Sequence, residues 1–538
     1  MKKAYINGMI HTMDDYKIAE AIIVENGKII FVGSSIDVLT HLDEDIEVID
    51  LKQKTVLPGL IDSHLHGLLS AQNMNQINLS SATSIDELVK IVNDNLDKYP
   101  DEEWIIGRGW NQDYFDVKEF PTKDDLDRIN TDKPICLIRA CIHICVVNSK
   151  ALEIINLDSN NLPVLEDGMI YLDDKQQPNG LFSESALDYV YQHLPKISLD
   201  DIKKLIVSFN KHLNSEGITS IHSDDFTALN GVEYTEVIKA YQELAQENKL
   251  HVKTYQQCLL PTPEKLNDFL DKGYHTKQDY GNYRIGPLKL LLDGSLGART
   301  ALIEGGYHDA PSEFGISTYN DKQLLELGKI AQYNNLQMAI HGIGDGAINQ
   351  IMRLYKTLNK DYYREDLRHG IVHCQITEAQ VLEEIAQEKT VIYAQPIFLH
   401  YDIHIVDDRV GQAKGSTSYA FKTLIDKGVS VSFGTDSPVE PTNPFNNIYC
   451  AITRKDLNGS FDKGWNEHEA VNIYEAIRAY TYEGAYQSFE EDRKGTIEVG
   501  KQADFIVIDQ DLFAIDVEEI PKTQVLKTFV NGELVYEK

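Results

Sequence analysis

Cysteine and long apolar runs are both scarce in this sequence. Six cysteines among 538 residues are too few for a disulfide framework, which indicates a reducing compartment, and the cytoplasm is the expected location. The N-terminal stretch MKKAYINGMIHTMDD lacks the apolar core of a secretory signal, and no run of about 18 apolar residues occurs. The sequence therefore predicts neither a signal peptide nor a membrane span.

Basic residues are outnumbered by acidic ones. Lysine and arginine total 51 against 84 aspartates and glutamates, which gives a formal net charge of −33. Such a field repels the phosphates of nucleic acids and of anionic lipids, so neither nucleic acid nor a membrane is an expected partner. We interpret the acidic excess as a solvated surface, with steering of cationic substrates as the alternative.

The two ends of the chain share a β-rich pattern. AIIVENGKIIFVG carries Asn26-Gly27 between two β-like runs, and TFVNGELVYEK carries Asn531-Gly532 in the same way, which is typical of type I′ hairpins. Small β pieces are marginal alone. We therefore expect residues 1–57 and 496–538 to pair into one composite β-sandwich domain.

Residues 58–495 have a different rhythm, in which short apolar runs alternate with helical stretches such as 234–248, 321–335 and 377–389. The runs are TVLPGLID (55–62), GITSIH (217–222), HVKTYQQ (251–257), GPLKLLLD (286–293), LQMAIHG (336–342), HGIVHC (369–374), TVIYAQP (390–396) and GVSVSFGTD (428–436). Eight βα units predict an α/β fold, a (β/α)8 TIM barrel.

One connection in this barrel is unusually long. About 150 residues separate the first run from the second, far more than an ordinary βα loop. This large insertion after strand 1, at approximately 70–212, contains patterned pieces such as EEWIIGRGWNQDYF. We expect it to be ordered and to lie over the mouth of the barrel as a lid.

Histidines and an aspartate stand where several of these runs end. His64 and His66 follow the first run, and His341, His373 and Asp436 end the fifth, sixth and eighth. Active sites of this fold lie at the C-terminal strand ends, and divalent metals bind neutral imidazole readily. Any one of these residues alone is better explained as an ordinary polar residue, but together they predict a metal site.

Lys289 stands inside the apolar fourth run, PLKLLLDG, where a charged ammonium is costly to bury. An ion pair with Asp293 or another barrel carboxylate would satisfy it. Alternatively, burial lowers the pKa of the amine, so that the neutral form takes up carbon dioxide and becomes a carbamate that bridges two metals.

At this point the sequence resembles the amidohydrolase superfamily, in the large-insertion branch called YtcJ-like or amidohydrolase family 3, which includes N-substituted formamide deformylases. The likeness runs nearly end to end and rests on VLPGLIDSHLHG (56–67), PNGLFSESA (178–186), GPLKLLLDGSLGARTA (286–301), HGIGDGA (341–347), RHGIVHC (368–374) and FGTDSPV (433–439). It implies two divalent ions, usually zinc, with one held by His64, His66 and Asp436, the other by His341 and His373, and a carboxylated Lys289 between them.

The expected activity is hydrolysis of a C–N amide bond in a small molecule of the N-acyl or N-formyl amine type. Metal binding lowers the pKa of water to about 7, so hydroxide is available to attack the carbonyl. Asp436 would take the proton from that hydroxide and pass it to the leaving nitrogen. A homodimer is the default expectation for a soluble enzyme.

Five further residues are candidates for substrate binding. Arg299 could clamp a substrate carbonyl or carboxylate, although a structural salt bridge explains it equally well. His143 and His222 could donate hydrogen bonds at the barrel mouth. Trp110 could line an apolar pocket, although an aromatic residue in the insertion is more often simply packed. Glu184 is a candidate of the same kind, with a substrate role and a structural role both open.

Three other functions stay open. A cyclic amidase of the dihydroorotase or hydantoinase kind would use the same metal chemistry. A deaminase would use one metal and a catalytic glutamate, which HGIGDGA lacks, and Lys289 would have no purpose there. The alternative outside enzymes is a metal-free binding barrel.

Overall fold

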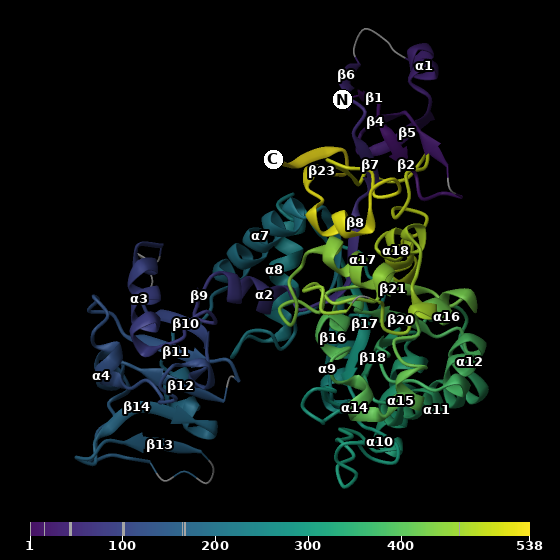
Figure 1. The fold of residues 1–538 in the computed structure, drawn as a ribbon. Helices are drawn as coiled ribbons and strands as arrows, with labels where there is room; N and C mark the ends of the chain where they lie inside the picture. Colours follow the sequence, from purple (N-terminus) through teal and green to yellow (C-terminus); the bar gives the residue numbers. More distant parts are fainter. Residues whose placement is uncertain are drawn as a thin grey trace. The chain divides into compact units, whose positions relative to one another are not determined.

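A computed structural model describes residues 2–15, 17–41, 46–98, 103–141, 143–163, 165, 168–461 and 463–538. The chain divides into two compact units (Figure 1). One consists of Met1–Leu68 and Ile202–Lys538, and the other is Leu69–Asp201.

The larger unit contains an eight-stranded parallel sheet. Its strands, in the order of their pairing, are β8 (Leu60–Leu65), β15 (Ile218–Asp224), β16 (Lys253–Leu259), β17 (Tyr283–Leu291), β18 (Met338–Gly342), β19 (Gly370–His373), β20 (Val391–Ala394) and β21 (Val431–Phe433). Two backbone hydrogen bonds join its ends: Asp436 N donates to His64 O at 2.8 Å, and His66 N donates to Ser437 O at 2.7 Å. The predicted barrel is confirmed, and each of the eight predicted runs contributes a strand.

Helices accompany the barrel strands. They include α8 (Tyr234–Gln246), α9 (Pro263–Asp271), α10 (Asp321–Tyr333), α11 (Asp345–Asp361) and α12 (Ala379–Gln387). Helix α9 begins where the Thr262 hydroxyl accepts from Lys265 N, with proline in the first turn, and α10 begins with a capping box between Asn320 and Gln323. None of the described helices is long and apolar enough to cross a membrane.

The first predicted run, 55–62, is two strands and not one. Strand β7 (Thr55–Pro58) pairs antiparallel with β22 (Phe505–Ile508), whereas β8 enters the barrel. Gly59 separates them, and a Cβ there would lie 2.3 Å from the Thr219 hydroxyl. Because the backbone approaches so closely, only glycine fits at the point where the chain changes sheets.

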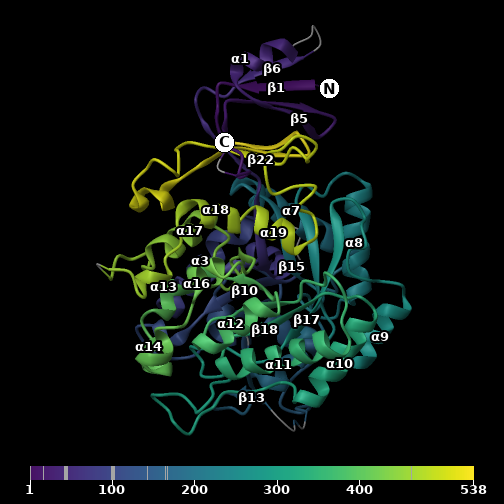
Figure 2. The same cartoon turned by 90° about the vertical axis from the view of Figure 1, so that its right-hand side faces the viewer.

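Two smaller sheets are built from the ends of the chain (Figure 2). One has the order β5-β4-β1-β6, and the other, β24-β23-β22-β7-β2-β3, joins strands from both ends. Their strands are β1 (Lys2–Ile6), β2 (Met9–His11), β3 (Ile18–Ala19), β4 (Ala21–Glu25), β5 (Lys28–Gly33), β6 (Glu47–Asp50), β23 (Val525–Val530) and β24 (Glu533–Glu537), besides β7 and β22.

Side chains of both small sheets share one core. Tyr5 and Ile22 from the first sheet cluster with Phe505 and Phe529 from the second. The β4–β5 hairpin turns at Asn26-Gly27 with φ of 50° and 77°, the left-handed conformation that a type I′ turn requires. The composite β-sandwich of residues 1–57 and 496–538 stays a proposal, which the shared core supports.

The second unit has a six-stranded sheet of its own, in the order β13-β14-β12-β11-β10-β9. The strands are β9 (Ile77–Asn78), β10 (Ile105–Trp110), β11 (Ile135–Arg139), β12 (Ile144–Val147), β13 (Met169–Leu172) and β14 (Pro178–Ser183). Helix α3 (Ile85–Asn95) packs its Leu88 and Val92 into the core of this unit. The extent of the insertion, 70–212, and its role as a lid stay predictions.

A buried ion pair connects the barrel to the mixed small sheet. Lys253 Nζ on β16 donates to Asp504 Oδ1 at 2.6 Å, and both side chains are at most 5% exposed. Asp504 Oδ1 also accepts from Asn531 N at 2.8 Å. The pair therefore fixes the last hairpin to the base of the barrel.

Replacing Asp504 with alanine should lower the free energy of unfolding by about 3–5 kcal/mol, because the Lys253 ammonium is left buried without its partner. Urea unfolding followed by circular dichroism measures the loss. Asp426→Ala, which removes an exposed partner of Lys422, is the control and should leave the free energy nearly unchanged. Equal effects of the two substitutions would contradict this role of Asp504.

Candidate metal centre

The six predicted metal ligands lie at one end of the barrel. His64 and His66 are at the end of β8, and Asp436 follows β21. Lys289, His341 and His373 lie on β17, β18 and β19 near the same C-terminal strand ends. Since all strands are parallel, the connectivity alone gathers these side chains at one mouth.

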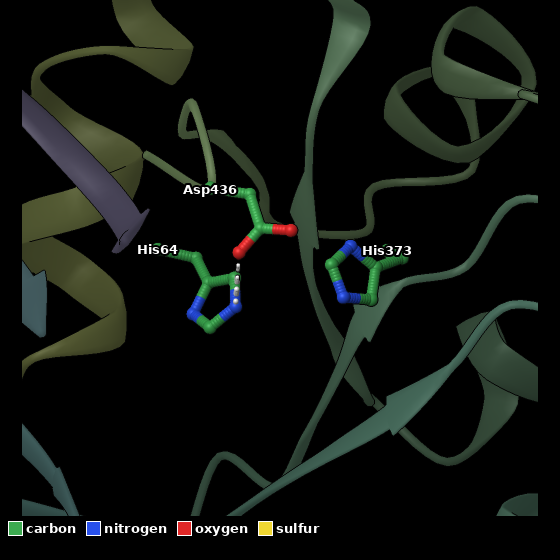
Figure 3. A group of neighbouring side chains, drawn as sticks. All are labelled: His64, His373 and Asp436. Atoms are coloured by element: carbon green, nitrogen blue, oxygen red, sulfur yellow. Dashed lines mark ion pairs between the residues drawn. The ribbon is translucent and has the colours of Figure 1, made fainter. Parts of the chain in front are cut away.

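The ligands on the first and last strands converge on one point. His64 Nε2 lies 3.3 Å from Asp436 Oδ1, and His66 Nε2 lies 3.2 Å from the same oxygen. Two atoms bound at about 2.1 Å to one tetrahedral ion are about 3.4 Å apart, so these separations fit ligands of a shared metal. His64, His373 and Asp436 each offer a ligand atom within 4.8 Å of the other two (Figure 3).

His341 adjoins this group through His373, with ring centroids 4.4 Å apart. Its Nε2 lies 3.2 Å from Gly294 O and 3.3 Å from Asp293 Oδ1. An imidazole whose Nε2 has such partners has Nδ1 left for a metal.

Lys289 is fully buried among these residues. Its Nζ lies 3.3 Å from His64 Nε2 and 3.7 Å from Asp224 Oδ2. Asp293, the partner considered from the sequence, instead accepts from the backbone N–H groups of Leu302 and Gly344 at 2.9 and 2.8 Å. The carboxylate that faces Lys289 is therefore Asp224.

Glutamines orient two of the imidazoles. Gln257 Oε1 lies 2.7 Å from His64 Nδ1, and Gln395 Oε1 lies 2.7 Å from His373 Nδ1. An amide oxygen requires a proton on the Nδ1 that faces it, which leaves each Nε2 as a free lone pair. Sequence reasoning missed both residues, although each is a polar side chain at the end of an apolar run.

Burial sets the protonation states of the site. It lowers the pKa of His64 to about 4 and that of His373 well below its ordinary value, and it also lowers the pKa of Lys289. Burial raises the pKa of Asp436, but its contacts with His64 and His66 outweigh this and hold the pKa well below the usual range. Neutral imidazole and ionised carboxylate are the forms that bind a divalent ion.

His66 differs from the other imidazoles. Burial acts to lower its pKa, but the neighbouring Asp436 carboxylate outweighs this effect, and the net pKa is raised. A raised pKa favours the protonated imidazole, and that proton must leave before Nε2 binds a metal.

The backbone at the site is shaped for these contacts. His373 and Asp436 have φ of 76° and 59°, a left-handed conformation that is uncommon outside glycine and that clusters at functional sites. Gly434, just before Asp436, passes so close to β8 that a Cβ would lie 2.5 Å from His64 N. Only glycine allows the two strands to approach in this way.

Of the residues predicted to bind substrate, Arg299 and His222 belong to the larger unit and have structural partners there. Arg299 forms a bidentate salt bridge with Asp309, Nε to Oδ1 at 3.2 Å and NH2 to Oδ2 at 2.7 Å. His222 is fully buried, and its ring centroid lies 5.2 Å from that of Tyr255. His222 precedes Asp224 by two positions on β15, and side chains two positions apart on a strand share a face. His222 therefore points into the barrel interior, farther from the C-terminal strand ends than Asp224.

The other three candidates belong to the insertion unit. Trp110 is 0% exposed in the core of that unit, and its Nε1 donates to Leu137 O at 2.9 Å, which is the arrangement of a packing residue. His143 Nδ1 lies 2.9 Å from Glu184 Oε2, and both side chains are exposed. A substrate role for this pair stays a prediction.

Gln257→Met and Gln395→Met should each lower the affinity for zinc about 10- to 100-fold, because the imidazole loses the partner that fixes its tautomer. Competition of the purified protein with a chromogenic chelator measures this affinity. Gln380→Met, on the exposed face of α12, is the matched control. Wild-type affinity in both barrel variants would show that these glutamines do not position ligands.

Known proteins resemble this chain over its whole length. A model described as "Amidohydrolase family" matches residues 47–536. The Bacillus subtilis (strain 168) protein named "Putative amidohydrolase YtcJ" is 32% identical over 100% of both chains. N-substituted formamide deformylase of Arthrobacter pascens is 25% identical, over 99% of this chain and 98% of its own.

A solved structure shows the same fold. An uncharacterized metal-dependent hydrolase from Pyrococcus horikoshii OT3 superposes with a TM-score of 0.79 at 29% identity, over 96% of this chain and 99% of that one.

Proposed function

Since this chain belongs to the amidohydrolase family and is a hydrolase, we propose that it cleaves a C–N amide bond of a small molecule, of the N-acyl or N-formyl amine type, at a site for two divalent metal ions. The observation that carries the proposal is the convergence of His64, His66 and Asp436 within 3.3 Å contacts at the barrel mouth. Support for the substrate type comes from the likeness to the formamide deformylase.

The donor set fits divalent metal ions, zinc being the usual choice for such ligands. His64, His66 and Asp436 would hold one ion and His341 and His373 the other, with Lys289 carboxylated between them. Burial lowers the pKa of Lys289, and this supports the carboxylation because only a neutral amine adds to carbon dioxide. When bound, such ions supply a nucleophile near neutral pH by lowering the pKa of water to about 7.

Asp436 would move the proton. Its carboxylate is ionised in the free site, so it can accept a proton from the attacking water and later donate it to the amide nitrogen. In the balanced reaction, the water oxygen bonds to the carbonyl carbon, the C–N bond breaks, and the amine leaves with the proton that Asp436 delivers. The acyl group leaves as a carboxylic acid or, from an N-formyl amine, as formic acid.

The alternatives differ in what they require of this site. A deaminase would need a catalytic glutamate near the later barrel histidines, and the segment from His341 into α11 carries Asp345 there instead. Asp345 contacts Lys414 and Glu304 N, so it is committed to structural partners. A cyclic amidase would use the same ligands, and only its substrate would differ.

A homodimer is proposed as the assembly.

Asp436→Asn should retain much of the bound metal and lose most of kcat, about 100-fold or more, because an amide oxygen can still bind a metal but an amide cannot shuttle the proton. Metal content by plasma mass spectrometry and turnover of the best substrate are measured on the same samples. Asp426→Asn, on the exposed end of α16 (Phe421–Asp426), is the control. Turnover like that of the wild type would rule out Asp436 as the proton shuttle.

The substrate class is tested by a panel of N-formyl amines, N-acyl amines, cyclic amides and aminopurines, assayed with added zinc or manganese. We expect the highest kcat/KM for an open-chain amide, and chelation should abolish the turnover. Preferred hydrolysis of a cyclic amide or release of ammonia from an aminopurine would favour the alternatives. No turnover together with no bound metal would favour a binding barrel.

A further inference from the structure

Asp224 is a buried carboxylate to which the described residues supply no hydrogen-bond donor. It ends β15, its side chain is 2% exposed, and among the described residues neither carboxylate oxygen accepts a hydrogen bond. The next residue, Asp225, is different, because it accepts from Leu68 N and from the Tyr241 hydroxyl, each at 2.8 Å. Leaving a buried carboxylate unsatisfied is costly, so the unpartnered oxygens of Asp224 point to a donor that arrives later.

Lys289 forms an ion pair with Asp224, with Nζ 3.7 Å from Oδ2. This separation is longer than a hydrogen bond, for which about 2.9 Å is usual. The backbone of Asp224 already serves the site, because its carbonyl oxygen lies 3.2 Å from His66 Nδ1. Asp224 thus contacts one ligand through its main chain and faces the bridging residue with its side chain.

Carboxylation changes what the Lys289 nitrogen needs. The neutral amine adds to the carbon of carbon dioxide, an N–C bond forms, one C–O π pair moves onto oxygen, and one amine proton leaves to water. The carbamate product keeps a single N–H. Its negative charge is shared by the two oxygens on the carbamate carbon, at the far end of the planar group. In a buried site that N–H requires an acceptor, and the direction of the acceptor fixes the plane of the carbamate.

We propose that Asp224 is a positioning residue that accepts the remaining N–H of carboxylated Lys289 and so turns the two carbamate oxygens toward the metal ligands. The proposal rests on the carboxylation of Lys289 in the proposed function. His64 Nε2 lies 3.3 Å from Nζ, so an acceptor at Asp224 leaves the carbamate oxygens free to face the imidazoles. The alternative is that Lys289 stays an uncarboxylated ammonium and forms an ion pair with Asp224.

Carbamate formation can be observed directly on the whole protein. Zinc-loaded protein is titrated with 13C-labelled bicarbonate, and the carbamate carbon is counted by 13C NMR, with bound zinc measured on the same samples. We compare the wild type with Asp224→Leu, which has no acceptor, and with Asp224→Asn, whose amide oxygen can accept the N–H. Asp426→Leu, at the exposed end of α16, is the matched control for the same change of side chain outside the site.

At saturating zinc, Asp224→Leu should need about tenfold more bicarbonate than the wild type for half-maximal carbamate, because the hydrogen bond to the N–H is lost. Asp224→Asn and the control Asp426→Leu should both remain close to the wild type. Thermal unfolding checks that each variant is folded, and Asp224→Ala replaces the leucine variant in the comparison should the latter misfold.

Two results would overturn the proposal, and each is distinct from a failure of the proposed function. Equal bicarbonate dependence in the folded leucine variant and the wild type would remove Asp224 as the acceptor. A wild type that hydrolyses amides with bound zinc but shows no carbamate signal would favour the ion pair. The loss of both amide hydrolysis and metal binding in the wild type would instead contradict the proposed function itself.

Discussion

The closure of the barrel between its first and last strands is the constraint on which the site depends. Asp62, buried on β8, accepts from Thr435 Oγ1 at 2.6 Å and from the backbone N–H of His64 and Thr435 at 3.2 Å. The carboxylate thus ties β8 to the segment after β21, where Gly434 lets the backbones meet. His64, His66 and Asp436 reach one another only because this junction holds, and the remaining ligands come from strands whose places follow from the parallel order.

Much of the barrel, and the convergence of the candidate ligands at one mouth, could be predicted, since strand-end position is visible in sequence. A run such as HGIVHC shows both an apolar strand and the histidine at its end. The division of 55–62 into β7 and β8 could not be seen, because the pairing of β7 with β22 depends on a segment more than 400 residues away. Gly59 marks the boundary only once its contact with Thr219 is known.

The residues that support the ligands were harder to find. Gln257, Gln395 and Asp224 look like isolated polar residues until the register of neighbouring strands shows which imidazole or amine each one faces. Arg299 and Trp110 have nearby partners in Asp309 and the core of the insertion unit, which are the salt-bridge and packing alternatives considered from the sequence, and their substrate roles stay predictions. Spacing along the chain reports which face a side chain occupies but not its partner on another strand.

The central claim is that this end of the barrel is a centre for two divalent ions. A crystal of the zinc-loaded protein, with anomalous differences collected on both sides of the zinc absorption edge, tests it most directly. We expect one peak among His64, His66 and Asp436, a second beside His341 and His373, and density for a carbamate on Lys289 between them. A single peak elsewhere, or none at these residues in zinc-saturated crystals, would contradict it.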